Sequence, residues 1–397
     1  MQKMILFWLV LLYLGCSPSQ TTPTLTSTEI PQLLDRAPGI QNGLEWDRIQ
    51  NKYAALKQAI NQKEELQKSK LELAQLFTLE ARVTGEHGHY YPAAKQVLQE
   101  ILEDTTTPKE IRFMALTTLA GVQLSLHEFS TALQTGRDAY ALNPYNAQIH
   151  GVLVDAMVEL GKYEEAVKVA DQMVAIRPDI RSYARVSYLR EIHGLPKEAI
   201  EAMQLAAMAG APGSEEKAWA LYQLGKMCQR YNEPKQAEEV FQYIMEERPE
   251  YPFAIAALAD LAADKGDYEQ AEALLKKACG IIPEVSFYES LALLYQKTAR
   301  QEEAQQLVPE ILAMLKDDEE NGHRMNLEYA AVHEQLRQDY DQALHYLMEA
   351  YQERPDNIEV NQRLAELYLK QGHPEQAKPY IEKAQRTNSK NPAIVAL

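Results

Sequence analysis

Histidines beside carboxylates are the residues of this chain whose types and spacing come closest to chemistry. The segment 333–337, His-Glu-Gln-Leu-Arg, begins like a zinc-peptidase helix, but Arg337 occupies the position of the required second histidine. The segment 127–131 fails in the same way, because Thr131 replaces that ligand. The sequence also contains no glycine-rich phosphate loop and no Gly-x-Ser-x-Gly elbow. We therefore predict no catalytic residues, no cofactor and no enzyme.

A second group of histidines lies near the start of the chain, where Glu86, His87 and His89 stand close together. Two imidazoles and a carboxylate suffice for weak metal coordination. The alternative is a solvated turn between two helices, which the neighbouring glycines Gly85 and Gly88 favour. The sequence therefore predicts a turn here and no metal site.

Composition limits the classes of protein that the chain can belong to. Its 397 residues are 46% hydrophobic, with 57 Asp and Glu against 40 Lys and Arg, which gives a net charge of −17. An apolar share of this size can supply a core, and the length would ordinarily mean two or three domains. The acidity argues against a general nucleic-acid binder, because phosphate backbones require cationic surfaces.

A short apolar run opens the chain. Residues 4–14 follow Lys3 and are all apolar, but eleven helical residues span only about 16 Å, half of a ~30 Å hydrocarbon core. A basic start and a short apolar centre are typical of a secretory signal. The run ends in Leu-Gly-Cys at residues 14–16, which resembles the lipobox of bacterial lipoproteins, although Tyr13 stands where Leu is usual.

This resemblance implies that residues 1–15 are a signal peptide and that Cys16 receives a diacylglycerol after cleavage. Ser17, in place of an Asp, implies sorting to the outer membrane, facing the periplasm. Residues 16–43 are predicted to form a flexible tether, because Ser, Thr and Pro dominate its beginning. An ordinary secreted protein with an incidental Cys16, or an uncleaved anchor, remains an alternative. The two other cysteines, Cys228 and Cys279, have apolar helical neighbours and are expected to be buried thiols.

The rest of the chain repeats itself. One alanine recurs at intervals of 33 or 34 residues, lengthened to 38 and 39 at two places: Ala132, Ala166, Ala199, Ala237, Ala271, Ala304, Ala343 and Ala377. In seven of the eight units a small residue lies twelve residues before this marker alanine: Ala120, Ser187, Gly225, Ala259, Ala292, Ala331 and Ala365. Several offsets kept together over eight units indicate one repeated supersecondary element.

The residues of one unit predict two packed helices. Residues 255–262 form one apolar helical stripe, and Gly266 supplies a helix stop. Asp267 can cap the next helix, whose own stripe runs over residues 268–278, and Pro283 prevents that helix from continuing. The marker alanine and the small residue before it let the two helices approach closely.

This pattern resembles the tetratricopeptide repeat family, with the best match at residues 219–225 followed by Ala237, Phe241 and Pro249. The resemblance implies an all-α fold, a right-handed superhelical solenoid of antiparallel helix pairs. The predicted organisation is a capping helix at 44–66, a divergent repeat at 67–108, eight repeats at 113–391 and a short end at 392–397.

Three further segments interrupt or end the array. The longer intervals contain insertions at residues 210–214 and 316–322, which we predict to be surface loops. At the end of the chain, Ile394, Val395 and Leu397 predict an open apolar face and hence weak self-association.

In the family, the first helix of each pair lines a concave groove, which is the usual peptide site. Carried to this sequence, the groove wall of two neighbouring repeats is basic and aromatic: Arg181, Arg185, Tyr188, Trp219, Tyr222, Lys226 and Arg230. The flanking repeats offer acids instead: Asp155, Glu159, Asp260 and Asp264. The cations could make bidentate contacts with an acidic segment, while the aromatic rings supply rigid contact area. The alternative is that the rings pack on adjacent helices and the cations pair with local acids.

These expectations combine into a membrane-anchored adaptor that binds other cell-envelope proteins or extended peptide segments through its groove. An accessory protein that binds envelope polysaccharide or another polymer through its groove aromatics is the alternative. Ionic strength separates the two, because acidic-peptide binding weakens with salt and sugar stacking does not.

Overall fold

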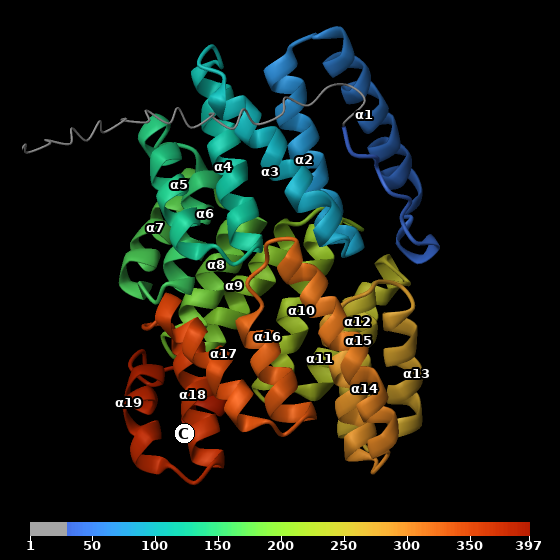
Figure 1. Ribbon diagram of the computed structural model, residues 1–397, viewed down its shortest axis with the longest axis vertical. Coiled ribbons are helices and arrows are strands. Elements are labelled where there is room, and N and C mark those ends of the chain that lie inside the picture. Colours follow the sequence, from blue (N-terminus) through green and yellow to red (C-terminus); the bar gives the residue numbers. More distant parts are fainter. Residues whose placement is uncertain (1–29) are drawn as a thin grey trace, which may run out of the picture.

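The computed structural model describes residues 30–397, all of whose regular elements are helices (Figure 1). The predicted signal peptide, Cys16 and the first part of the predicted tether lie outside these residues. None of the described helices combines the length and hydropathy needed to cross a bilayer. The predicted all-α solenoid of antiparallel helix pairs is confirmed.

The array begins with the short 3-10 helix η1 (Pro38–Ile40), α1 (Gly43–Gln62) and the pair α2 (Leu66–Thr84) and α3 (His87–Glu103). Eight further pairs follow. Their first helices are α4 (Lys109–Ser125), α6 (Ala147–Glu159), α8 (Ile180–Ile192), α10 (Glu215–Arg230), α12 (Pro252–Asp264), α14 (Val285–Lys297), α16 (Asn326–Ala331) with the π-helical turn η2 (Val332–Leu336), and α18 (Ile358–Lys370). Their second helices are α5 (Phe129–Leu142), α7 (Tyr163–Ile176), α9 (Pro196–Ala209), α11 (Pro234–Glu247), α13 (Tyr268–Cys279), α15 (Gln301–Glu320), α17 (Tyr340–Glu353) and α19 (Pro374–Ala384). The last element is α20 (Pro392–Val395).

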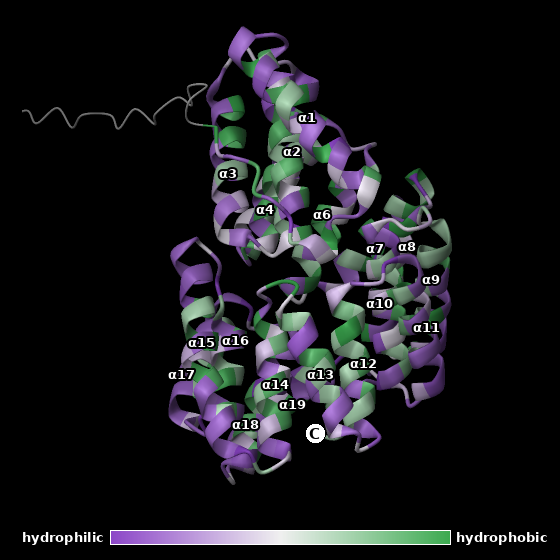
Figure 2. Ribbon diagram, turned by 90° about the vertical axis from the view of Figure 1, so that its right-hand side faces the viewer, coloured by the Kyte–Doolittle hydropathy of each residue, from purple (hydrophilic) through white to green (hydrophobic). Residues whose placement is uncertain are grey.

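The marker alanines hold the pairs together. Each of the eight is 0% exposed, as close packing of the two helices requires. At Gly225 the approach is closer still, because a Cβ there would lie 2.3 Å from Cε1 of Phe241. Figure 2 shows the helices alternating between hydrophilic and hydrophobic residues, as amphipathic helices do. The core therefore runs along the array between paired helices.

The turn predicted inside each pair is also confirmed in the unit of residues 255–283. Gly266 adopts the left-handed region at φ 82°, and the Asp267 side chain accepts a hydrogen bond from the backbone N–H of Gln270. The second helix, α13, ends at Cys279, before Pro283. Cys228 is buried and Cys279 is partly buried, and both are free thiols whose pKa burial raises to about 11.

The two insertions behave differently from one another. Residues 210–214 form the predicted loop, which Arg248 holds by donating to the carbonyl of Gly213 at 2.9 Å. Residues 316–320 are not a loop, because they continue α15 to Glu320. The extra residues therefore lengthen a helix by more than a turn before the chain reverses at residues 321–322.

A one-residue shift accompanies the second insertion. The buried small residue of that repeat is Ala330, at 0% exposed, whereas the predicted Ala331 is partly exposed. The π-helical turn Val332–Leu336 lies between Ala330 and the marker Ala343. Because a π turn accommodates one extra residue, it accounts for part of the 39-residue interval.

The superhelix closes on itself, so that the last helix pairs lie against the loops of α6–α9 (Figure 1). The Tyr163 hydroxyl accepts a hydrogen bond from the backbone N–H of Ile358 at 2.9 Å, and Arg386 donates to the carbonyl of Gly161 at 2.6 Å. Ile394 is 3% exposed within the core of α5–α8. The predicted open apolar end is therefore wrong for Ile394, although Val395 is exposed.

The beginning of the described chain is also packed. Arg36 is buried, with its guanidinium on Glu80 at 2.7 and 2.9 Å and on Glu45 at 2.7 Å. Ile40 belongs to a core cluster with Ile255 and Phe287. The predicted tether, residues 16–43, therefore ends earlier than expected, because residues 30–42 lie on the array.

Candidate partner-binding cavity

Three adjoining cavities occupy the inside of the closed superhelix. The largest part of the predicted groove lines one of them, a cavity of about 790 Å³ that we call the central cavity. It shares Gly85 and His87 with a cavity of about 880 Å³, the histidine cavity, and Asp155 and Glu159 with one of about 380 Å³. Six of the seven predicted site residues line the central cavity: Arg181, Arg185, Tyr188, Trp219, Tyr222 and Arg230. Lys226 is not among the lining residues.

The aromatic side chains of this cavity fall into two kinds. Trp219 is 42% exposed and Tyr188 is 46% exposed, so both present free ring surface to the interior of the superhelix. Tyr222 instead packs against the rings of Phe241 and Phe253, with centroids 6.3 and 5.8 Å away, and burial raises its pKa to about 12. The expectation of three neighbouring contact aromatics thus reduces to two.

Carboxylates surround the hydroxyl of Tyr188. Desolvation raises the pKa of its hydroxyl well above 10, and the carboxylates of Glu159, Glu359 and Glu191 raise it further. The neutral phenol is therefore the form present at all ordinary pH values, able to donate one hydrogen bond to a ligand.

Every predicted cation is already paired. Arg181 contacts Glu216 at 2.6 Å, and Lys226 contacts Asp260 at 3.0 Å. Arg230 pairs with Glu191. These contacts join neighbouring helix pairs and correspond to the alternative in which the cations pair with local acids.

Arg185 makes the most complete of these contacts. Its guanidinium binds both carboxylate oxygens of Asp155, at 2.8 and 2.5 Å, and donates to the carbonyl of Gly151 at 3.1 Å. Asp155 and Asp260, which we expected to make the flanking repeats acidic, are therefore the partners of the cations.

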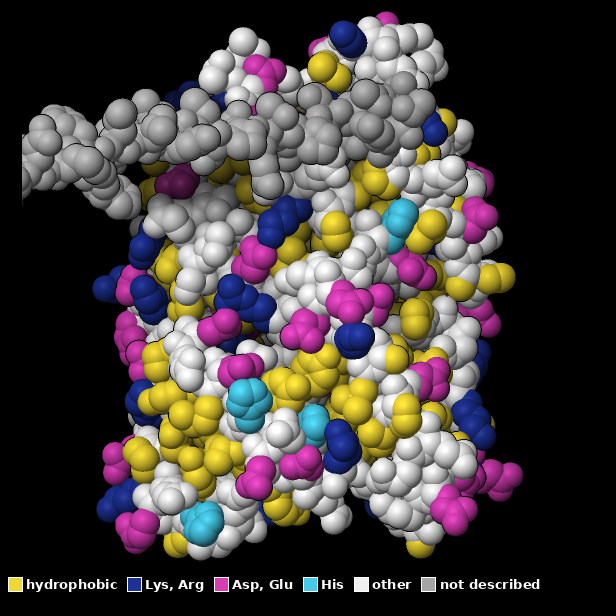
Figure 3. Space-filling model, viewed as in Figure 1, with side chains coloured by type: hydrophobic (Ala, Val, Ile, Leu, Met, Phe, Trp, Pro, Cys, Tyr) yellow, Lys and Arg dark blue, Asp and Glu magenta, His cyan; other side chains and the backbone are white. Residues whose placement is uncertain are grey.

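The lining of the central cavity carries charges of both signs. Six carboxylates face four guanidinium groups: Asp155, Glu159, Glu191, Glu215, Glu216 and Glu284 against Arg82, Arg181, Arg185 and Arg230. The predicted basic centre is therefore mixed in charge. Figure 3 shows the same interspersion of acidic and basic side chains on one outer face.

Sequence reasoning missed the far wall of the central cavity. Tyr251, Phe253 and Ile282 line it from later repeats, and Arg82 and His87 line it from α2 and α3. Closure of the superhelix brings Arg82 and His87 to the site, which no local pattern marks, whereas Tyr251 and Phe253 lie at the start of α12, the first helix of the next pair.

The histidines at residues 86–89 do not form the predicted solvated turn. His87 is the first residue of α3, and its ring lies 5.4 Å from those of Tyr91 and His323. His89 instead contacts the carbonyl of Gln32 at 2.8 Å. The side chains that approach His87 are Asp318, from the second insertion, and His323, which directly follows it.

Together, the stacked helix pairs and the interior cavity define a helical-repeat binding protein. More specifically, the chain contains tetratricopeptide repeats: the family described as tetratricopeptide repeat matches residues 123–190, 229–278 and 336–397. Proteins with this repeat are generally non-enzymatic scaffolds, and their folds bind protein or peptide partners.

Similarity to individual proteins is partial. The type IV pilus assembly protein PilF of Pseudomonas aeruginosa is 31% identical over 133 residues, 33% of this chain and 51% of that protein. The chain thus matches about half the length of this relative. The human IFIT1 dimer with PPP-AAAA is similar in structure, with a TM-score of 0.50 and 13% identity over 87% of this chain and 88% of that one. A tetratricopeptide repeat protein from Parabacteroides merdae has a TM-score of 0.44 and 17% identity over 64% of this chain and 97% of that one.

Proposed function

We propose that this protein is a membrane-anchored adaptor that binds an extended segment of another cell-envelope protein in the central cavity. The observation that carries the proposal is the pair Tyr188 and Trp219, two large rings that remain exposed inside a cavity of about 790 Å³. Rigid aromatic side chains in a concave site supply contact area at low entropic cost, which makes them frequent anchors of protein partners.

The binding energy would come from the rings more than from charge. Each cation beside them already has a carboxylate partner, so a ligand carboxylate would have to displace an existing ion pair. Such exchange gains little free energy, because one charge-assisted contact replaces another. We therefore expect an extended segment with apolar or aromatic side chains that fit over Trp219, and polar groups that reach the phenol of Tyr188.

A photo-crosslinking amino acid tests this site in cells of the native source. Placed at position 219, it should give a discrete adduct with one or few envelope proteins after irradiation. The matched control is position 145, since Tyr145 is 83% exposed but does not line the central cavity. Equal adducts at both positions, or none at 219, would overturn the assignment of the cavity.

The anchor of the proposed adaptor is the lipid on Cys16. Acyl chains contribute about 0.8 kcal/mol per buried CH₂, so several chains hold a protein to a membrane stably. Partial similarity to a type IV pilus assembly protein supports an envelope location. Incorporation of labelled fatty acid into the wild type, and its loss in Cys16→Ser, is the expected result. An unlabelled mature wild type would contradict lipidation.

A second candidate function is binding of an envelope polysaccharide. The paired cations favour it, since they leave ring stacking as the dominant contact available at Trp219 and Tyr188. The adduct formed at position 219 separates the two candidates, because protease degrades a crosslinked protein and leaves a crosslinked polysaccharide intact. The excess of carboxylates around the central cavity supports the expectation that nucleic acid is not the ligand.

A further inference from the structure

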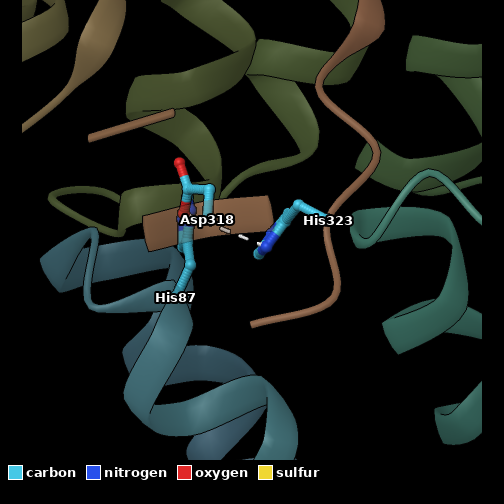
Figure 4. Close-up of side chains that lie close together, drawn as sticks. All are labelled: His87, Asp318 and His323. Carbon is cyan, nitrogen blue, oxygen red and sulfur yellow. Dashed lines mark ion pairs between the residues drawn. The ribbon is translucent and has the colours of Figure 1, made fainter. Parts of the chain in front are cut away.

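Three side chains from two distant parts of the sequence converge in the histidine cavity: His87, Asp318 and His323 (Figure 4). One ligand-type atom from each lies within 4.8 Å of the others. His323 Nδ1 is 3.9 Å from Oδ1 of Asp318, and the rings of His87 and His323 have centroids 5.4 Å apart. Two imidazole nitrogens and one carboxylate oxygen thus surround a common point.

The backbone holds these groups together through contacts of its own. His87 is the first residue of α3, whereas Asp318 lies in the lengthened last turns of α15 and His323 in the segment before α16. That segment is anchored at Arg324, whose N–H donates to the carbonyl of Leu126 at 3.3 Å. Since these contacts are independent of any ligand, the cluster is preorganised.

An unpartnered buried nitrogen points to a ligand. His323 is only 6% exposed, yet its Nδ1 has no hydrogen-bond partner. A buried polar atom without a partner costs free energy and calls for an explanation, of which an unobserved ion is one. In the same cavity, Oε1 of Glu289 and Oε2 of Glu328 are likewise buried and unpartnered. Three buried side-chain atoms along this cavity therefore have no hydrogen-bond partner within the protein.

The charges around this space would attract a cation. The lining of the histidine cavity includes seven carboxylates and no Lys or Arg: Glu86, Glu284, Glu289, Glu310, Asp317, Asp318 and Glu328. The neutral form of an imidazole, with its free lone pair, is the form that binds a metal cation, and here two imidazoles stand among these carboxylates.

We propose that His87, Asp318 and His323 bind one divalent transition-metal ion, with Zn²⁺ as the best match to this nitrogen and oxygen ligand set. Imidazole nitrogens suit zinc, copper and nickel, whereas calcium and magnesium prefer oxygen ligands. Tetrahedral zinc places its ligand atoms about 3.3 Å apart, so small side-chain rotations would complete the site. Three protein ligands leave a fourth position for water.

Such an ion would tie the first helix pair to the second insertion. Because His87 precedes the other two ligands by more than 200 residues, the metal would cross-link an early and a late part of the closed superhelix. Binding only to the closed form would stabilise that form by mass action. This role does not depend on which partner the central cavity binds.

The test uses the untagged full chain in detergent, freed of metal by a chelator and titrated with ZnCl₂ in a calorimeter. One saturable Zn²⁺ site per chain is expected, together with a rise in melting temperature that the chelator reverses. His323→Gln and Asp318→Asn should each weaken Zn²⁺ binding at least about 100-fold. His89→Gln is the control, because His89 lies beside the site in sequence but contacts Gln32.

The outcomes separate clearly. Absence of saturable Zn²⁺ binding to the wild type would overturn the proposal, whatever the variants do. Binding to the variants as tightly as to the wild type would also overturn it, since the ion would then sit elsewhere. Should either variant fail to fold, as judged by its helical circular dichroism, His87→Gln at the start of α3 gives the same comparison.

Discussion

Glu159 and Arg354, 195 residues apart in the sequence, form an ion pair at 2.6 Å across the closed superhelix. The Arg354 guanidinium also lies over the ring of Phe129, 4.8 Å from its centroid. Desolvation raises the pKa of the Glu159 carboxyl, and Arg354 opposes that shift. Arg354 is buried and Glu159 is partly exposed, so removing Glu159 would leave the buried Arg354 charge without its counterpart. The array has consequently become a ring in which the last repeats support the early ones.

Closure can be measured with a pair of glycines that occupy the same turn in two repeats. Gly161 and Gly266 have φ of 72° and 82°, so alanine at either position costs about 1–2 kcal/mol of backbone strain. A Cβ at Gly161 would also lie 2.2 Å from the carbonyl oxygen of Asp356, whereas at Gly266 nothing lies within 4 Å. Gly161→Ala should therefore destabilise the protein by about 1–3 kcal/mol more than Gly266→Ala in urea unfolding. Equal losses would mean that closure contributes no stability.

The buried positions and helix caps of this fold could be predicted because the same residue types recur at the same offsets in the repeats. Ala271 is buried and Asp267 caps its helix, as the spacing of apolar, small and turn residues predicts. Asp318 shows the limit of such reasoning. It lies in a helix because the insertion extends α15, and its approach to His87 depends on closure, which no local pattern encodes.

The position of the candidate site could be predicted from the sequence, but its charge could not. Trp219 and Arg185 line the central cavity because both lie on first helices of neighbouring pairs, whose inward faces follow from helical periodicity. That Arg185 is held by Asp155 could not be foreseen, because an acidic chain offers many possible partners. The prediction of a basic centre failed for this reason.

Close packing at the marker alanines gives a second prediction. Ala271 is 0% exposed between α12 and α13, so Ala271→Leu should lower the free energy of unfolding by about 1–3 kcal/mol through overpacking. Ala175, on the exposed side of α7, provides the control. Ala175→Leu should change stability by no more than about 0.5 kcal/mol. Urea titration followed by circular dichroism measures both free energies of unfolding. An Ala271→Leu variant as stable as the wild type would contradict the close packing of α12 on α13.

A pH-dependent contribution is expected from Glu247, which secures the first insertion. Hydrogen bonds from Lys217 and Tyr243 lower the pKa of this carboxyl from 4.5 to about 2. Lys217 lies 2.9 Å away, and the backbone N–H of Gly213 donates to the other oxygen at 3.1 Å. Because the folded-state pKa is depressed, the stabilisation is complete above about pH 4.5 and disappears as pH falls towards 2.

Glu247→Gln checks this expectation. Relative to the wild type it should cost about 1 kcal/mol at neutral pH, since the contact is partly screened by solvent, and almost nothing near pH 2. Glu246→Gln, at the adjacent exposed residue, should be neutral throughout. A deficit of Glu247→Gln that stays constant down to pH 2 would show that charge is not its cause.

The last prediction concerns the proposed partner site. It requires substitutions that remove contacts with the partner without destabilising the fold. Tyr222 packs on Phe241 and Phe253, and Arg185 is bound to Asp155, so replacing either would disturb the array itself. Tyr188 and Trp219 are the better choice, because both rings are exposed within the cavity. The double variant Tyr188→Ala with Trp219→Ala should keep its unfolding midpoint.

Loss of the two rings should nevertheless remove most of the partner binding, since central aromatic anchors each contribute about 2 kcal/mol or more to such interfaces. The measurement is recovery, by the purified tagged variant, of the protein crosslinked at position 219 of the wild type. Tyr145→Ala should recover it fully, because Tyr145 is exposed outside the central cavity. Recovery that persists in the double variant and falls with rising salt would instead assign binding to the cations, with Arg181 and its exposed ion pair as the first to examine.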